Sequence, residues 1–395
     1  MDPQLGLRPP PSLLLAAQPL NPMPNSSTQH PETTGHLFWL DWLRFLAAFM
    51  VVAIHARGGN WVEWGRLAEA SQTKLAAVFF ALTRAGAECV LVFFVLSGFL
   101  VGGKLIERVA DRSFRMRDYA IDRISRIWVP LVPALLWSAL VAHWVGKPVS
   151  WVGFGGNLLG LQVVWFRSFA DNIPLWSLAY EIWFYILAGA AAFWTLSGRR
   201  GRIASSFAIA VAFAVFTRLG AEFLFAWLLG AMTYWLCRQP RQWSLALTGC
   251  VLIGLGYLNS QLRTATVSVD MSSWLRFMPP AEVATVVLSL GMALVLPYVT
   301  QLRPRTQRGM AINEMGTRLA AFSYTLYLTH YPLLYVWEYY LPERHSSIDI
   351  PNSALYLLRI ASCLLLSWLL YLPFERNTSW VRTQMKRVWS AKSVD

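Results

Sequence analysis

The chain has 395 residues, of which 56% are hydrophobic and only 14% are charged, and its formal net charge is +13. Soluble proteins average about 25% charged residues, so this composition excludes an ordinary soluble domain and indicates a polytopic membrane protein. The positive charge would favour a nucleic-acid partner only if the Lys and Arg residues were not sorted by membrane topology.

Residues 1–36 are rich in proline and contain one short apolar run, Leu13–Ala17. That run is too short to span a bilayer and lacks the flanks of a signal peptide. We therefore expect residues 1–36 to form a disordered, Pro-rich cytoplasmic tail.

Ten apolar stretches follow, each close to the length of one membrane-spanning helix. They lie at residues 38–55, 85–103, 128–145, 176–196, 203–218, 222–237, 243–258, 281–299, 319–338 and 354–373. If the amino terminus is cytoplasmic, the inner loops hold 21 Lys or Arg residues and the outer loops hold ten. This bias places both termini in the cytoplasm and removes the reason to expect a nucleic-acid partner. The predicted fold is an all-α, polytopic transmembrane bundle of about ten helices.

The four cysteines all lie inside apolar segments, without C-x-x-C spacing or a neighbouring histidine; they are Cys89, Cys237, Cys250 and Cys363. Neither a disulfide framework nor a metal site is expected. No internal repeat of convincing period is present, which counts against an inverted-repeat transporter.

The first apolar stretch carries Asp41, Arg44 and His55. Charged and titratable side chains in a membrane helix are costly unless they are paired or solvated, so they indicate a functional site. The 11 residues from Arg44 to His55 are about three helical turns, so both side chains leave one face roughly 16 Å apart. Asp41 can pair with Arg44 on that face. Alternatively, Arg44 snorkels from a helix end and His55 is interfacial.

The second stretch ends in Gly98, Gly102 and Gly103, a small-residue spacing that usually lets helices approach closely. Before the third stretch, Arg123 and Arg126 lie three residues apart on one helical face. They are either plain topology determinants or a pair of guanidinium groups that suit phosphate.

The segment NIPLWSLAYEIWFYIL places Glu181 about two turns into an aromatic helix. A carboxylate among aromatic side chains is costly unless it faces a partner or water, so Glu181 is a candidate functional residue. The aromatic residues themselves are typical of a membrane-interface belt.

The ninth stretch contains Tyr327 and His330 at i and i+3, followed by Pro332. Proline interrupts the backbone hydrogen bonds of a helix and can open a polar pocket there. Alternatively, His330 is a hydrogen-bonded bundle residue without further function. We assign no role to Glu338 and Glu375, which lie at the ends of predicted spans.

Together these segments resemble the acyltransferase 3 family of integral membrane acyltransferases. The matching motifs occur in the family's order over about residues 38–375 and read LDWLRFLAAFMVVAIH, FFVLSGFL, RISRI, WSLAYEIWFY and FSYTLYLTHYPLL. The resemblance implies a bacterial inner-membrane protein of approximately ten helices. Such a protein transfers an acyl group, commonly acetyl, from cytoplasmic acyl-coenzyme A to a hydroxyl of a carbohydrate or similar acceptor.

The resemblance also implies roles for particular residues. Catalytic roles are implied for His55, Glu181 and His330, and binding of the acetyl-coenzyme A donor for Arg44, Arg123 and Arg126. We expect Trp176 and Tyr327 to contact the acceptor substrate, and we expect no metal. The first motif reads DWLRF where the family commonly has DGLRG, so Trp42 and Phe45 narrow the space beside Arg44.

The expected organisation is a tail at 1–36, a transmembrane acyltransferase domain at 37–376 and a basic cytoplasmic tail at 377–395. The expected acceptor is a cell-envelope or exported polysaccharide or its lipid-linked precursor. Membrane lipids are expected partners. Separate glycan-assembly proteins are also expected, because many relatives carry a fused esterase-like domain that is absent here, and any second transfer step would then need a separate protein. The alternatives are a transporter or flippase of a lipid-linked glycan and an acyltransferase that acts on a small glycosylated metabolite.

Overall fold

The computed structural model describes residues 39–240, 242–265 and 278–391. These residues belong to one compact unit that begins at Leu37. The predicted tail at 1–36 lies outside the described residues.

Every regular element within these ranges is helical. The α-helices are α1 (Leu40–Asn60), α2 (Lys74–Leu82), α3 (Gly86–Ser97), α4 (Lys104–Ala110), α5 (Met116–Trp144), α6 (Trp151–Leu158), α7 (Trp176–Leu196), α8 (Arg199–Phe216), α9 (Ala221–Leu236), α10 (Trp243–Ala265), α12 (Ala281–Thr300), α13 (Gln307–Ala320), α14 (Ser323–Tyr340), α15 (Ile350–Tyr371) and α16 (Thr378–Ala391). A π-helical segment, η3 (Gly98–Gly103), joins α3 to α4. Single 3-10 turns are η1 (Trp64–Arg66), η2 (Glu69–Ser71), η4 (Phe169–Asp171), η5 (Ile173–Leu175) and η6 (Glu375–Asn377).

Each of the ten predicted apolar stretches falls on a helix, which confirms the all-α class. In the described ranges, six helical segments are long and apolar enough to cross a membrane: Lys74–Ala110, Met116–Trp144, Ile173–Leu196, Trp243–Arg263, Ala281–Thr300 and Ile350–Trp389. The count of ten crossings and the side of each terminus stay predictions. Five further helices of the described ranges, α2, α4, α6, α13 and α16, were not predicted, and α16 occupies most of the expected basic tail.

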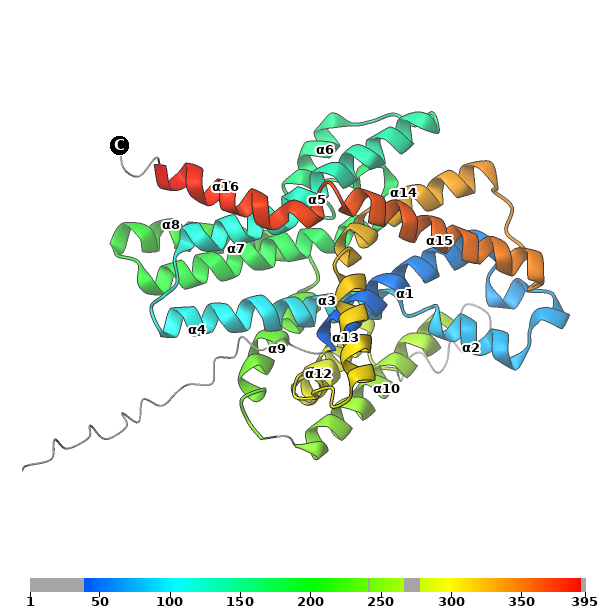
Figure 1. Ribbon diagram of the computed structural model, residues 1–395, viewed down its shortest axis with the longest axis horizontal. Coiled ribbons are helices and arrows are strands. Elements are labelled where there is room, and N and C mark those ends of the chain that lie inside the picture. The colour runs from blue at the N-terminus through cyan, green and yellow to red at the C-terminus, as the bar shows by residue number, and fades with distance from the viewer. Residues whose placement is uncertain (1–38, 241, 266–277, 392–395) are drawn as a thin grey trace, which may run out of the picture. The chain divides into compact units, whose positions relative to one another are not determined.

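Helix α1 is central to the packing, because it contacts α3, α13, α14 and α15 (Figure 1). Its buried face is made largely of small side chains, among them Ala48, Val52 and Ala56, none of which is exposed at all. Small residues let helix backbones approach closely. The polar side chains that α1 carries are thereby held against four neighbouring helices.

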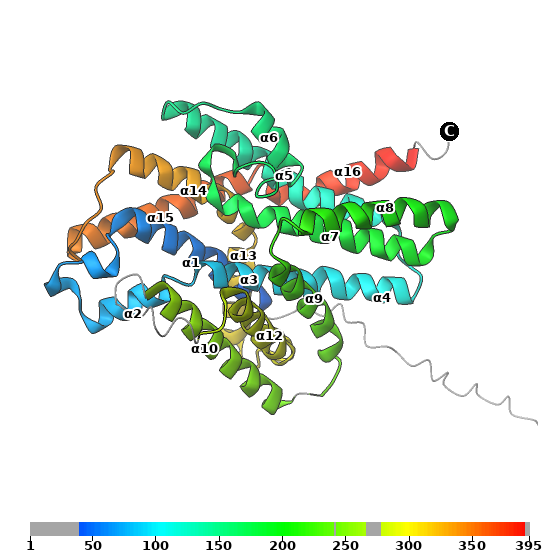
Figure 2. The same cartoon turned by 180° about the vertical axis from the view of Figure 1, so that it is seen from behind.

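The glycines of η3 pack directly against α9, which confirms their predicted role in close helix packing. A Cβ atom on Gly98 would collide with the backbone carbonyl oxygen of Trp227 in α9. The same addition on Gly103 would collide with the side chain of Tyr234. Figure 2 shows α9 beside the α3–α4 helix from behind, with α7 and α8 running as an antiparallel pair.

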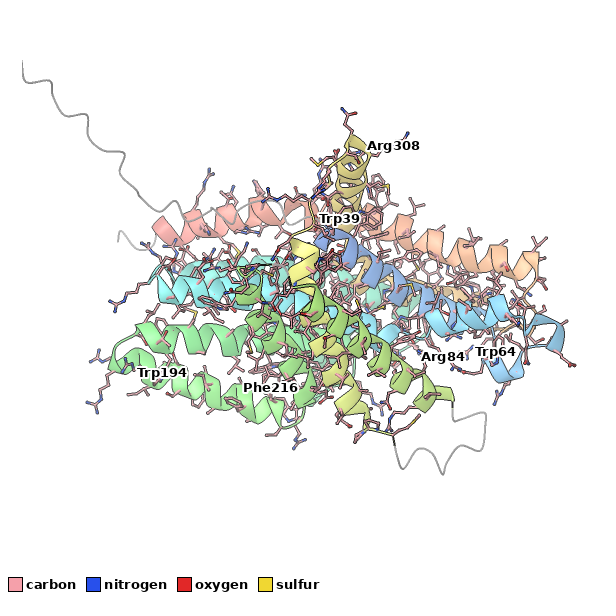
Figure 3. The ribbon with its side chains drawn as sticks, turned by 90° about the horizontal axis from the view of Figure 1, so that it is seen from below. Trp39, Trp64, Arg84, Trp194, Phe216 and Arg308 are labelled. Carbon is pink, nitrogen blue, oxygen red and sulfur yellow. The ribbon has the colours of Figure 1, made fainter. Side chains whose placement is uncertain are left out.

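The loops that follow α1 and α14 are hydrogen-bonded to each other at one end of the helices. The backbone of His345 donates to the Asn60 carbonyl (2.9 Å), and the backbone of Val62 donates to the His345 carbonyl (3.1 Å). The buried guanidinium of Arg359 in α15 donates to the Gly59 carbonyl (2.5 Å). Figure 3 labels Trp64 at this end and Trp194, near the end of α7, at the other.

We predict that Gly98→Ala lowers the thermal stability of the protein, because the new methyl group must push α3 away from the α9 backbone. Gly254→Ala is the matched control, since a Cβ atom at that helical glycine meets nothing within 4 Å. The midpoint of thermal unfolding in detergent, followed by tryptophan fluorescence, measures both. Equal midpoints for the two variants would contradict the close-packing account.

Candidate functional site

Two histidines predicted in separate segments meet in the structure. His55 of α1 and His330 of α14 lie 3.0 Å apart, measured from Nδ1 of His55 to Nε2 of His330. Their rings are stacked, with centroids 5.2 Å apart and planes inclined by 19°. The ring of Tyr331 packs edge-on against His55 from another side (5.0 Å). The pair is therefore held in one geometry.

The hydrogen-bond partners assign the tautomers of a neutral pair. Nδ1 of His330 lies 3.0 Å from the carbonyl oxygen of Leu326, which can only accept, so this nitrogen carries the hydrogen. Nε2 of His330 then has a free lone pair and accepts the hydrogen bond from Nδ1 of His55. By elimination, the lone pair of His55 lies on Nε2, for which the described residues supply no hydrogen-bond donor.

The backbone around His330 is held by side chains from other segments. Pro332 has no N–H, so it leaves the carbonyl of Leu328 without its helical partner. The fully buried amide of Asn172 donates to that carbonyl instead (2.9 Å). The indole of Trp137 in α5 donates to the Thr329 carbonyl (3.3 Å). These contacts satisfy the polar groups that the proline exposes, as burial in a membrane helix requires.

His55 lines a cavity of about 260 Å³, here called the histidine cavity. Its other walls combine aromatic and charged side chains: Trp61, Tyr331, Tyr335, Arg57, Arg344, Glu63 and Glu338. Both signs of charge are present, two arginines against two glutamates. The cavity therefore offers hydrogen-bond donors, acceptors and aromatic faces without a strong net charge.

A second cavity of about 350 Å³, here called the cationic cavity, is different in character. Five cationic side chains line it, against one carboxylate, that of Glu181; the five are Arg44, Lys104, Arg123, Arg126 and Arg382. All three arginines predicted to bind the donor are among them. Such a concentration of positive charge favours a ligand with several negative charges.

Carboxylates hold two of these arginines in place. Arg44 pairs with Asp41 (3.3 Å), as the sequence predicted. Arg126 pairs with Glu375 (3.0 Å), whose side chain is only 3% exposed. The second oxygen of Glu375 accepts hydrogen bonds from the backbone N–H (3.0 Å) and the hydroxyl (2.7 Å) of Thr325, in the first turn of α14. One carboxylate thus positions an arginine and caps a helix.

Arg123 retains unused hydrogen-bonding capacity. Its guanidinium lies over the ring of Tyr185 (5.2 Å), and its Nε is buried without a hydrogen-bond partner among the described residues. Tyr185 in turn donates to Glu181 (2.6 Å). A buried polar atom without a partner is unfavourable, so Arg123 is arranged for a ligand that accepts hydrogen bonds.

The predicted site residues are thus divided between two places. His55 and His330 form the pair, whereas the three arginines, Glu181 and Tyr327 line the cationic cavity. Within the described ranges, Glu181 makes no hydrogen bond or ion pair with either histidine. Trp176 lines neither cavity and packs instead in an aromatic cluster with Phe94 and Phe223.

Four residues that shape the two cavities and the histidine pair were not among the predicted site residues: Glu375, Asn172, Arg57 and Arg382. Glu375 had a usable signal, since a carboxylate beside an apolar stretch needs a partner. No sequence pattern marks Asn172, because its role is a hydrogen bond to a carbonyl that is 156 residues away in the sequence. Arg57 and Arg382 were counted only as topology determinants.

The chain was compared with known proteins. Residues 37–372 match a family model described as an acyltransferase domain, Acyl_transf_3. A curated protein of Haemophilus influenzae, described as uncharacterized, is 28% identical over 110 residues. That match covers 24% of this chain and 45% of the relative. No solved structure matches the chain.

We predict that Glu375→Gln lowers the free energy of unfolding by about 1–3 kcal/mol, because Arg126 loses a buried charged acceptor. Thermal or denaturant unfolding of the detergent-solubilised protein measures the change. Glu314→Gln is the matched control, since its pair with Arg318 lies on the exposed surface and should contribute little. A loss no larger than that of the control would show that the buried pair does not stabilise α14.

Proposed function

Because this chain belongs to the acyltransferase 3 family of membrane acyltransferases, we propose that it transfers an acyl group from cytoplasmic acyl-coenzyme A to a carbohydrate hydroxyl. Acetyl is the proposed acyl group, and an envelope or exported polysaccharide or its lipid-linked precursor is the proposed acceptor. The observation that carries the proposal is the His55–His330 pair, which presents an unshared nitrogen lone pair to a cavity.

The cationic cavity supports the choice of donor. Coenzyme A is an extended polyanion with a pyrophosphate and a ribose phosphate at one end and the thioester at the other. Five cationic side chains suit the phosphate end, and the unpartnered Nε of Arg123 offers it a hydrogen bond. In this proposal both chain termini and the mouth of the cationic cavity face the cytoplasm.

The two cavities lie within reach of a single donor molecule. Arg44 lines one and His55 lines the other, and both belong to α1, roughly 16 Å apart along its axis. Tyr327 of α14 lines the cationic cavity, one turn before His330. With its phosphates among the arginines, the pantetheine arm of the donor runs along α1 and brings the thioester to His55.

The tautomer assignment defines the chemistry of His55. Its Nε2 takes the proton from the acceptor hydroxyl as that oxygen attacks the thioester carbonyl. The tetrahedral intermediate then expels the coenzyme A thiolate, which takes the proton from the imidazolium. His330 accepts the Nδ1–H of His55 throughout and stabilises the ring in this orientation.

The same lone pair allows a two-step route. Nε2 of His55 attacks the thioester carbonyl and the thiolate leaves, which gives an acyl-imidazolium whose Nδ1–H stays hydrogen-bonded to His330. The acceptor hydroxyl then attacks the acyl carbon, its proton passes to the thiolate, and the neutral imidazole is restored. The direct route does not form an acyl-enzyme. Acid-quenched protein incubated with labelled donor and no acceptor distinguishes the two, because only the second route leaves label on the protein.

The histidine cavity supports a carbohydrate acceptor. Aromatic faces such as Trp61 and Tyr331 suit the apolar face of a sugar ring. Arg57 and Glu338 supply donors and acceptors for its hydroxyls. Its walls come partly from the loops after α1 and α14, at the end where Figure 3 labels Trp64. In the proposed orientation this is the outer side, where an exported glycan lies.

We predict that His55→Ala abolishes acyl transfer, because the variant loses the nitrogen lone pair assigned as the base. Membranes containing each variant are incubated with radiolabelled acetyl-coenzyme A and a lipid extract of the native host, and label is followed into glycan. His143→Ala is the matched control, since His143 is exposed at the end of α5. Transfer retained by correctly inserted His55→Ala protein would refute the assigned base.

We predict that His330→Ala lowers kcat about 100-fold with little change in KM for the donor, because His55 loses the acceptor that orients it. His330→Gln should recover part of the rate, since its amide oxygen can accept the same hydrogen bond. The label-transfer assay at varied donor concentration measures both constants. A Gln variant no faster than the Ala variant would exclude orientation by hydrogen bonding as the role of His330.

A further inference from the structure

The carboxy-terminal helix α16 lies beyond the stretch that matches the acyltransferase domain, which ends at residue 372. Even so, α16 packs on α5, the helix that carries Arg123 and Arg126. In Figure 1, α16 is drawn in red and lies beside α5. A segment outside the family domain therefore lies beside the proposed donor site.

Ion pairs and a hydrogen bond hold α16 on α5. Nε of Arg382 lies 3.4 Å from Oδ1 of Asp122, and Nζ of Lys386 lies 3.9 Å from the same oxygen. Arg117 donates to the Lys386 carbonyl (2.8 Å). These contacts fix Arg382 and Lys386 relative to the residues that line the cationic cavity.

Of these two cations of α16, only Arg382 lines the cationic cavity. Its side chain is 40% exposed, compared with 25% for Arg44 in the same cavity. Arg382 thus lies toward solvent, whereas Arg44 lies deeper, on the helix that leads to His55. A donor whose thioester reaches His55 must place its most distant phosphate at the exposed end.

We propose that Arg382 binds the terminal ribose phosphate of the coenzyme A donor, so that α16 is part of the donor site. This inference rests on the proposed function, because it takes coenzyme A as the ligand. Asp122 keeps Arg382 at the cavity mouth in the free protein, and the guanidinium can pair with phosphate through the nitrogens that Asp122 leaves available. Arg382 is a substrate-binding residue in this account and takes no part in the chemical step.

The test measures binding of coenzyme A and of 3′-dephospho-coenzyme A to the full-length protein in detergent, by isothermal titration calorimetry. We expect Arg382→Gln to weaken coenzyme A binding about tenfold, the effect of losing one charge-assisted hydrogen-bonded contact. We expect the same variant to leave binding of the dephospho form unchanged within about twofold, because the phosphate that Arg382 contacts is missing.

Two matched variants distinguish a direct contact between Arg382 and the phosphate from an indirect effect on the packing of α16. Lys386→Gln also loses an ion pair to Asp122 but does not line the cavity, so its affinities should match those of the wild type. Arg123→Gln should weaken binding of both ligands, because this account places Arg123 at the pyrophosphate, which both ligands carry. An equal loss of affinity for both ligands in Arg382→Gln, or no loss for either, would overturn the assignment.

The role of Arg382 and the acyl-transfer activity can fail independently of each other. A phosphate-dependent effect of Arg382 with no acyl transfer in any assay would keep this assignment and refute the transferase chemistry. Acyl transfer that proceeds with an unaltered donor affinity in Arg382→Gln would refute the assignment alone. If the wild-type protein binds neither ligand, both proposals fall.

Discussion

The hydrogen bond between His55 and His330 is the contact on which the site depends. It joins α1 to α14 across 275 residues of sequence and sets which nitrogen of His55 is free. Its geometry depends on α14, where Pro332 removes a backbone donor and Asn172 supplies a replacement. The backbone carbonyls around His330 find partners in the surrounding segments, as burial in a helix bundle requires, and only Nε2 of His55 is left to face the cavity.

Charge is divided between the two cavities in a way that matches two different ligands. The cationic cavity holds its arginines with carboxylates that lie behind them, such as Glu375, so that positive charge faces the open space. The histidine cavity balances arginines with glutamates and adds aromatic rings. A polyanionic donor and a polyhydroxylated acceptor would therefore enter different spaces and meet at the histidine pair.

Helix positions were predictable because the length and apolar composition of a segment largely decide whether it forms a membrane helix. The ion pair in the first turn of α1 and the close packing of the η3 glycines were also predictable, because both depend on residue spacing along a single helix. The meeting of His55 with His330 depends on how α1 packs against α14, which no local pattern encodes. Tertiary packing also places Glu181 among arginines, gives Glu375 its two partners and leaves Trp176 outside both cavities.

The most direct test of the central claim is a cryo-electron microscopy structure of the protein with a non-hydrolysable thioether analogue of acetyl-coenzyme A. The account predicts phosphate density beside Arg123 and Arg126 in the cationic cavity. It also predicts that the thioether end lies next to Nε2 of His55. Phosphate density in the histidine cavity, or an arm that does not approach the histidine pair, would contradict the account.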